Sequence, residues 1–73
     1  MRDFIFVVVG DIGRRTIFYN ALLKNGFTDR FPNDKGRKNL LVFCIYPKEK
    51  LFMVSKYYYG TCLSVEEFAD LFL

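Results

Sequence analysis

The sequence predicts a single small α+β domain over residues 1–73, with elements in the order strand, helix, strand, strand, helix (βαββα) and a mixed sheet of three or four strands. Three observations lead to this prediction. A chain of 73 residues is too short for two hydrophobic cores. Its composition, 52% hydrophobic and 19% aromatic, is too apolar for a disordered chain. Its apolar residues form continuous runs in some segments and recur at helical spacing in others.

The first element is a strand over residues 4–9, a run of β-branched and aromatic side chains that Gly10 stops. Neither this run nor the run at residues 40–46 has a polar side, which is typical of strands buried on both faces. We therefore expect one helix on each face of the sheet. In the alternative, both helices pack on one side, and the other face is an apolar surface for a partner or for a second copy of the chain.

A helix follows this strand, because apolar residues after Ile12 recur at helical spacing: Ile17, Phe18, Ala21 and Leu22. Asp11 is suited to cap its start, and Asn25 with Gly26 supplies the left-handed residue that ends it. The connection is long enough for a right-handed crossover. We therefore expect the strands before and after it to be parallel.

Residues 28–38 form a polar loop with several turn-forming residues, among them Pro32 and a cluster at residues 33–36. These eleven residues exceed the usual connection of about 4–6, and long loops often carry function. Phe31 lies in this loop beside Arg30, a combination that is common at binding hot spots. We favour the alternative, in which Phe31 anchors the loop in the core.

A β-hairpin comes next, with arms at residues 40–46 and 51–56 and a turn at residues 47–50. The three tyrosines at residues 57–59 either extend the second arm or begin a fourth strand, and Gly60 ends the run. Their rings are suited to stacking on nucleic-acid bases. The interpretation that we favour is that they fill the sheet and place their hydroxyls at its rim.

The last predicted element is a short helix with a clear start. Residues 64–67, Ser-Val-Glu-Glu, match the capping box, in which the side chains of Ser64 and Glu67 each accept a hydrogen bond from the other residue's backbone. Apolar residues then recur at intervals of three and four, which makes one face of the helix apolar: Val65, Phe68, Leu71 and Phe72.

The absence of histidine removes the commonest metal ligand and the side chain best suited to proton transfer at neutral pH. Cys44 and Cys62 are too few for a structural zinc site, so we expect no metal and no cofactor. We expect both cysteines to be reduced and buried; the alternative is one disulfide between them. No apolar stretch approaches the ~20 residues of a membrane span, and no cleavage pattern follows the first apolar run, so we expect a cytoplasmic protein.

Residues 9–16 have the strand, glycine turn and helix layout of a phosphate-binding loop. The spacing of Gly10 and Gly13 fits neither the dinucleotide-binding motif nor the P-loop, so we interpret the glycines as allowing a tight turn. The hydroxyl and thiol side chains have no histidine to serve as a base, and the carboxylates are scattered along the chain. The sequence therefore predicts a protein that is not an enzyme.

Charge is unevenly distributed along the chain, which has a formal net charge of +3. Residues 14–56 hold ten basic and three acidic side chains, whereas residues 57–73 hold three acidic side chains and no basic ones. Such a distribution attracts nucleic acid or an acidic protein surface, unless the charges merely solvate turns and loops. We expect a partner-binding region at the helix start, the long loop and the hairpin turn: Arg14, Arg15, Arg30, Phe31, Lys35, Arg37, Lys38, Lys48 and Lys50.

The whole chain, a one-domain βαββα with a Gly26-Phe27 helix exit and a closing Ser-Val-Glu-Glu-Phe-Ala-Asp-Leu-Phe helix, resembles the small early or accessory proteins of tailed bacteriophages. The resemblance implies a protein of the host cytoplasm that binds a larger host machine and inhibits or redirects it. Host RNA polymerase, whose surface is largely acidic, is a compatible partner. Our leading hypothesis is a non-enzymatic protein that acts by protein–protein contact, and it allows for a homodimer. The alternative is nucleic-acid binding through the basic loop and the tyrosines.

Overall fold

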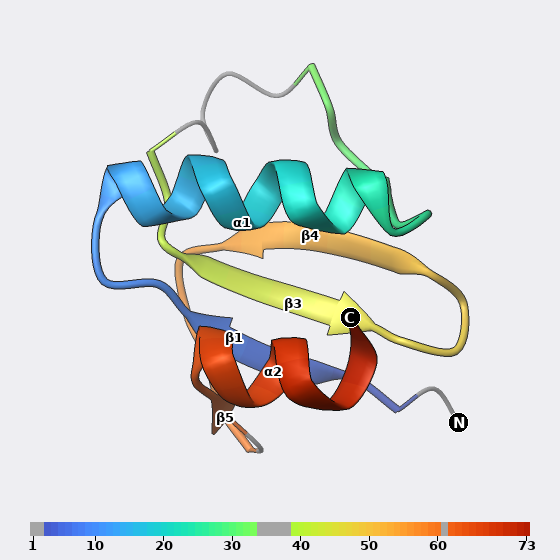
Figure 1. The fold of residues 1–73 in the computed structure, drawn as a ribbon. Helices are drawn as coiled ribbons and strands as arrows, with labels where there is room; N and C mark the ends of the chain where they lie inside the picture. Colours follow the sequence, from blue (N-terminus) through green and yellow to red (C-terminus); the bar gives the residue numbers. More distant parts are fainter. Residues whose placement is uncertain (1–2, 34–38, 61) are drawn as a thin grey trace.

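The computed structural model, which describes residues 3–33, 39–60 and 62–73, is a two-layer domain in which two helices pack on one face of a five-stranded mixed sheet (Figure 1). The predicted small α+β domain with two helices and a mixed sheet is confirmed. The sheet has five strands rather than three or four, because each edge strand is two residues long and leaves no pattern in the sequence. The elements are β1 (Ile5–Val8), α1 (Ile12–Lys24), β2 (Thr28–Asp29), β3 (Val42–Tyr46), β4 (Leu51–Ser55), β5 (Cys62–Leu63) and α2 (Val65–Phe72).

The strands lie in the order β2-β4-β3-β1-β5, and β3 runs against both of its neighbours. The prediction that β1 and β3 are parallel is therefore wrong: they are antiparallel, with Val7 opposite Phe43. The parallel crossover through α1 ends at β2 instead, since β2 is parallel to β4 and hence to β1. Strand β3 begins at the end of the sheet towards which β2 runs, since Val42 lies opposite Ser55, and it therefore runs in the opposite direction.

Both helices begin and end where the sequence predicts. The Asp11 carboxylate accepts a hydrogen bond of 2.8 Å from the Arg14 backbone N–H at the start of α1. At its end, Gly26 has a φ of +88°, and the Phe27 N–H donates to the Leu22 carbonyl oxygen over 3.0 Å. The capping box that starts α2 has both of its hydrogen bonds: the Ser64 N–H donates to Glu67, and the Glu67 N–H donates to Ser64.

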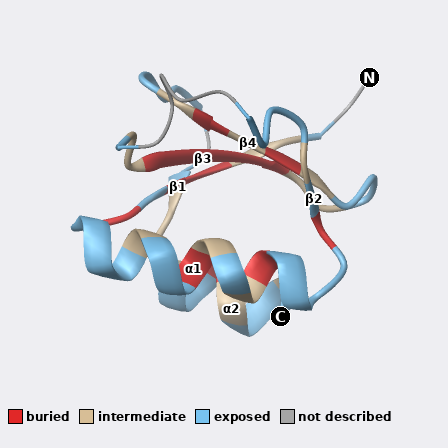
Figure 2. Ribbon diagram, turned by 90° about the horizontal axis from the view of Figure 1, so that it is seen from above, coloured by how far each residue is buried: buried red, intermediate tan, exposed pale blue. Residues whose placement is uncertain are grey.

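The main core lies between the sheet and the helices, so the prediction of one helix on each face is wrong (Figure 2). The Phe18 ring of α1 meets the Phe43 ring of β3 edge to face at 5.1 Å and the Phe68 ring of α2 at 5.7 Å. These contacts place both helices on the same face. The apolar opposite face does not need a helix, because aromatic side chains cover part of it.

Candidate protein-binding face

The helix-free face of the sheet has a small apolar cluster of its own. Strand register places Phe6 of β1 next to Cys44 of β3, and Cys44 next to Met53 of β4, on the same side of the sheet. Phe6 and Cys44 are buried with Val42, and three further side chains pack against them: Phe4, Tyr46 and Met53. This face therefore keeps an apolar floor although no helix lies on it.

Aromatic rings on this face contact one another in a fixed arrangement. The Phe4 ring lies 5.4 Å from Phe6 and 5.8 Å from Tyr46, measured between ring centroids. Tyr59, which follows β4 by four residues, lies 5.9 Å from Phe4 and 5.2 Å from Phe6. The segment after β4 thus reaches across to β1. Its position is set by edge-to-face and tilted ring contacts, the geometries that aromatic pairs prefer.

The three consecutive tyrosines that lead to this surface are strongly exposed: Tyr57, Tyr58 and Tyr59 are 77%, 57% and 69% exposed, and ring contacts place Tyr59 on the surface itself. They form neither an extension of β4 nor a further strand, because β4 ends at Ser55. The Ser55 hydroxyl donates to the Tyr57 carbonyl oxygen and accepts from the Tyr57 N–H, which turns the chain out of the sheet. We call the helix-free surface the tyrosine face: Phe4, Val8, Tyr46, Met53 and Tyr59.

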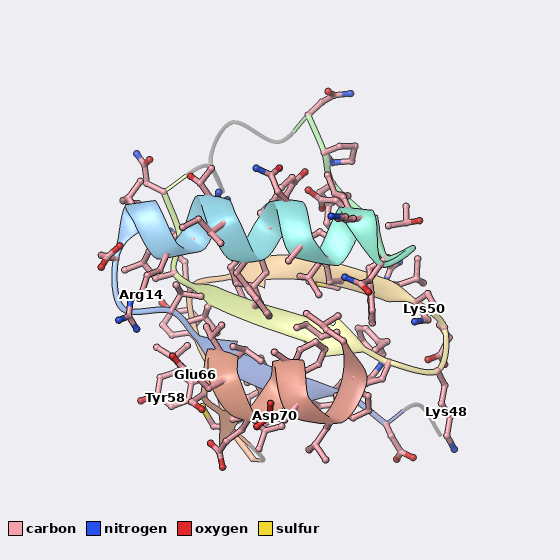
Figure 3. The ribbon with its side chains drawn as sticks, viewed as in Figure 1. Arg14, Lys48, Lys50, Tyr58, Glu66 and Asp70 are labelled. Atoms are coloured by element: carbon pink, nitrogen blue, oxygen red, sulfur yellow. The ribbon has the colours of Figure 1, made fainter. Side chains whose placement is uncertain are left out.

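The structure separates the predicted basic helix start from the predicted basic hairpin turn (Figure 3). Arg14 lies at one end of the sheet, with its Nη1 3.8 Å from the Glu66 carboxylate. Lys48 and Lys50 lie at the other end, after β3; the Lys48 Nζ is 4.0 Å from the Asp3 carboxylate, and the Lys50 Nζ is 4.5 Å from the centre of the Phe27 ring. These residues therefore do not form one continuous patch.

Arg15 and Phe31, two other residues of the predicted region, differ in their surroundings. The Arg15 Nε donates to the Leu40 carbonyl oxygen over 2.8 Å, and its guanidinium lies over the Tyr19 and Phe43 rings, so Arg15 ties α1 to the chain before β3. Phe31 is 41% exposed, and the prediction that it anchors the loop in the core is wrong. Its N–H donates to the Asp29 carboxylate, which holds the backbone in a turn and leaves the ring outside.

Arg30 and the basic loop complete the predicted set. The Arg30 N–H donates to the Phe52 carbonyl oxygen over 3.0 Å, and its guanidinium carbon lies 5.7 Å from the centre of the Phe31 ring. The Arg30–Phe31 pair therefore stands at the surface, next to the end of β2. Lys35, Arg37 and Lys38 lie outside the described residues.

The two thiols are free and lie on the strands that flank β1. Cys44 and Cys62 both pair with Phe6, so about two strand spacings of ~4.8 Å separate them, which is too far for a disulfide. Cys44 is buried as predicted, whereas Cys62 is exposed at the edge of the sheet, contrary to the prediction. Burial raises the pKa of the Cys44 thiol, and this effect outweighs the opposing hydrogen bond with Tyr46, so Cys44 is a weak nucleophile.

Tyr19 and Asp29 form a polar link between α1 and β2. The Tyr19 hydroxyl donates to the Asp29 carboxylate over 2.8 Å. Burial, followed by this hydrogen bond, raises the pKa of the Tyr19 hydroxyl, which keeps it protonated as a donor.

Within the described ranges, no three histidine, cysteine or carboxylate side chains gather where they could hold a metal ion. In the same ranges, neither helix is both long enough and apolar enough to span a membrane.

The sequence contains a signal for the tyrosine face in its apolar residues rather than in its charged residues. Residues 4–9 and 40–46 lack polar positions, and Phe4 and Tyr46 belong to the ends of these runs. Their grouping with Tyr59 depends on the path from β4 to β5, which no local pattern encodes.

Comparisons with family models, with curated proteins and with solved structures found no match to this chain.

Proposed function

We propose that this protein is a non-enzymatic binding protein that docks on a larger protein through the tyrosine face. The observation that supports this proposal most directly is the row of exposed tyrosines beside an apolar sheet surface that the helices leave uncovered. Contiguous exposed apolar surface of this kind marks interaction sites.

Tyrosine suits this role because its ring supplies apolar contact area and its hydroxyl supplies a hydrogen bond. It also has few rotatable bonds, so it loses little conformational entropy on binding. Ring contacts with Phe4 and Phe6 already hold Tyr59, and the Ser55 hydroxyl holds the Tyr57 backbone. A surface that is ordered before it meets its partner keeps more of the contact energy as affinity.

A protein partner fits this face better than a nucleic acid. Single-stranded nucleic acids need cations that follow the phosphates beside the stacked bases. In the described part of the chain, Arg14 and Lys48 each lie beside a carboxylate, and Lys50 lies over the Phe27 ring, on the helix side of the sheet. These cations do not form a track along the tyrosines, and Lys56, which directly precedes them, is a single charge rather than a track.

The net charge of +3 supports a partner with an acidic surface, since complementary charge speeds association. Together with the resemblance to small phage accessory proteins, it makes inhibition or redirection of a bacterial machine such as RNA polymerase the biological role that we propose.

The test compares the wild-type chain with the double variant Tyr46→Ser/Tyr59→Ser and with the control Leu23→Ser, which changes an exposed residue of α1. Each chain is immobilised and exposed to a nuclease-treated bacterial lysate and to purified RNA polymerase. We expect the double variant to lose at least about tenfold in affinity for the captured protein, whereas the control retains it. A partner that binds all three chains equally would remove the tyrosine face from the interface.

A second arm measures binding of a labelled single-stranded oligonucleotide at low and at physiological salt. The proposal predicts weak binding that does not depend on Tyr46 and Tyr59. Tight binding that falls steeply with salt and is lost in the double variant would replace the protein partner with a nucleic acid.

A further inference from the structure

A shallow groove separates the two helices on the surface that faces away from the sheet. The helices lie side by side and run in the same direction (Figure 1). The groove has a volume of about 200 Å³; its walls are mainly apolar, with Ile17 and Ala21 from α1 and Ala69 and Leu73 from α2. Arg14 and Glu66 close one end, since both lie in the first turn of their helices.

The groove exposes apolar surface that the fold of one chain does not bury. Ile17 is 72% exposed although it sits in the middle of α1, and Leu73 at the other wall is also exposed. Ala21 and Ala69 have small side chains, which leaves room for a side chain of another molecule between the helices. This surface is separate from the tyrosine face, because the sheet and its core lie between them.

The helices that flank the groove carry opposite charges. Helix α1 has three basic residues and no acidic one; Arg15 is turned to the sheet, which leaves Arg14 and Lys24 exposed. Helix α2 has three exposed acidic residues and no basic one. The exposed charges nearest to the groove are Arg14 on one side and Glu66 on the other, and they pair over 3.8 Å. The apolar groove thus lies between a helix whose exposed charges are positive, here called the positive strip, and a helix whose exposed charges are negative, the negative strip.

We infer that the occupant of this groove is a second copy of the chain, related by a two-fold axis that runs along the groove. A rotation about this axis lays each α1 over the partner's α2, so a positive strip meets a negative strip on both sides of an apolar centre. The rotation preserves position along the axis, and Arg14 and Glu66 are already at the same level. Each Arg14 therefore comes opposite the partner subunit's Glu66.

The charges of the helices also favour a two-fold axis along the groove over a two-fold axis across it. A two-fold axis across the groove would lay α1 on α1 and α2 on α2, which sets like charges against each other. A different protein would need a negative strip, an apolar strip and a positive strip in the order that faces the strips of this chain. A second copy has these strips already.

The dimer is expected to be weak. Helices of 13 and 8 residues are about 20 Å and 12 Å long at about 1.5 Å per residue, so the shared area is well below that of a standard interface. Self-association should therefore depend on concentration and decrease with salt, because the charged strips stay partly in contact with solvent.

The first experiment is sedimentation velocity on the full chain from about 5 μM to about 1 mM, a range that covers weak interfaces. We expect the mean mass to rise from monomer towards dimer. Ile17→Gln should weaken self-association at least about tenfold, whereas Leu71→Gln, which changes a similarly exposed side chain of α2 outside the groove, should not. A monomer at every concentration, or equal effects of the two variants, would overturn the inference.

The second experiment tests the pairing itself. Arg14→Glu alone and Glu66→Arg alone should each stay monomeric, because each sets like charges opposite each other twice. An equimolar mixture of the two variants should dimerise again, since both contacts regain unlike charges in the mixed dimer. Circular dichroism checks that each variant is folded. Failure of the mixture to associate, or loss of the dimer in Tyr46→Ser/Tyr59→Ser, would assign self-association to another surface.

Discussion

The helix-covered face of the sheet and the tyrosine face have equally apolar strands but are shielded from water in different ways. On the helix side, Phe43 and Phe52 are fully buried beneath α1 and α2. On the other side, Phe6 and Cys44 are almost as well buried, but single side chains such as Tyr59 cover them, and Tyr59 is itself exposed. A face that is shielded by individual rings keeps apolar groups at the surface. Under the proposed function, this difference is what leaves the tyrosine face available to a partner.

The largest expected contrast between the two faces is in stability. Phe43→Ala removes a fully buried ring that contacts Phe18 and Phe52, and we expect it to cost about 3–5 kcal/mol in the free energy of unfolding. Tyr59→Ala removes an exposed ring and should cost only about 0.5–1.5 kcal/mol. Urea denaturation of both variants measures the difference. Equal losses would mean that the tyrosine face is part of the core.

Thiol reactivity tests how well the rings of the tyrosine face shield the buried residues beneath them, among them Cys44, from solvent. Cys62 is exposed, whereas Cys44 is 7% exposed, and burial raises the pKa of its thiol. With a disulfide reagent at neutral pH we expect one fast thiol and a second that reacts at least about 100-fold more slowly. Single Cys→Ser variants assign the two phases. Two fast thiols in the folded protein would show that the floor is open.

The helix-covered face also depends on how α1 ends. Gly26 has a φ of +88°, so we expect Gly26→Ala to cost about 1 kcal/mol of stability through strain in the left-handed region. Gly10→Ala is the matched control, because a Cβ there meets nothing within 4 Å and its backbone does not need glycine. The control should be neutral or slightly stabilising. Equal midpoints of thermal unfolding in the two variants would contradict this view of the helix end.

The smallest expected effect concerns the start of α2. Hydrogen bonds from Ser64, first from its backbone and then from its side chain, lower the pKa of the Glu67 carboxyl. Because the folded-state pKa is the lower one, ionised Glu67 stabilises the fold above the usual carboxyl pKa, and this contribution is lost as pH falls through the lowered value.

Glu67→Gln should therefore flatten the fall in the thermal midpoint between neutral and acidic pH. Asp70→Asn removes a charge from the same helix outside the capping box and serves as the control. An unchanged slope in Glu67→Gln would show that this carboxylate does not contribute to the acid sensitivity.

Local signals predicted the helices and the hairpin well. Asp11, Gly26 and Ser64 fix their helix ends through hydrogen bonds or backbone conformation within a few residues, so the sequence pattern is sufficient there. The hairpin turn at residues 47–50 follows the end of β3 for the same reason. What the sequence could not predict depends on distant contacts: the two-residue strands β2 and β5, and the antiparallel pairing of β1 with β3.

The candidate site was less predictable than the fold. The distribution of charge along the chain suggested one basic region. Arg14 and Lys48 nevertheless lie at opposite ends of the sheet, because β3 runs along the sheet before the chain reaches Lys48. The strand runs suggested two covered faces, since an apolar side chain has the same pattern whether a helix or a single ring covers it. Phe31 illustrates the same limit: its ring is exposed because the Asp29 turn directs it outward.

The placement of both helices on one side gives the molecule two outward surfaces that point in opposite directions. Occupation of one surface leaves the other accessible. If two copies join through their helices, their tyrosine faces point away from each other on the outside of the pair. Such a pair would bridge two partner molecules, one on each side, because faces that point in opposite directions cannot both meet a single target surface.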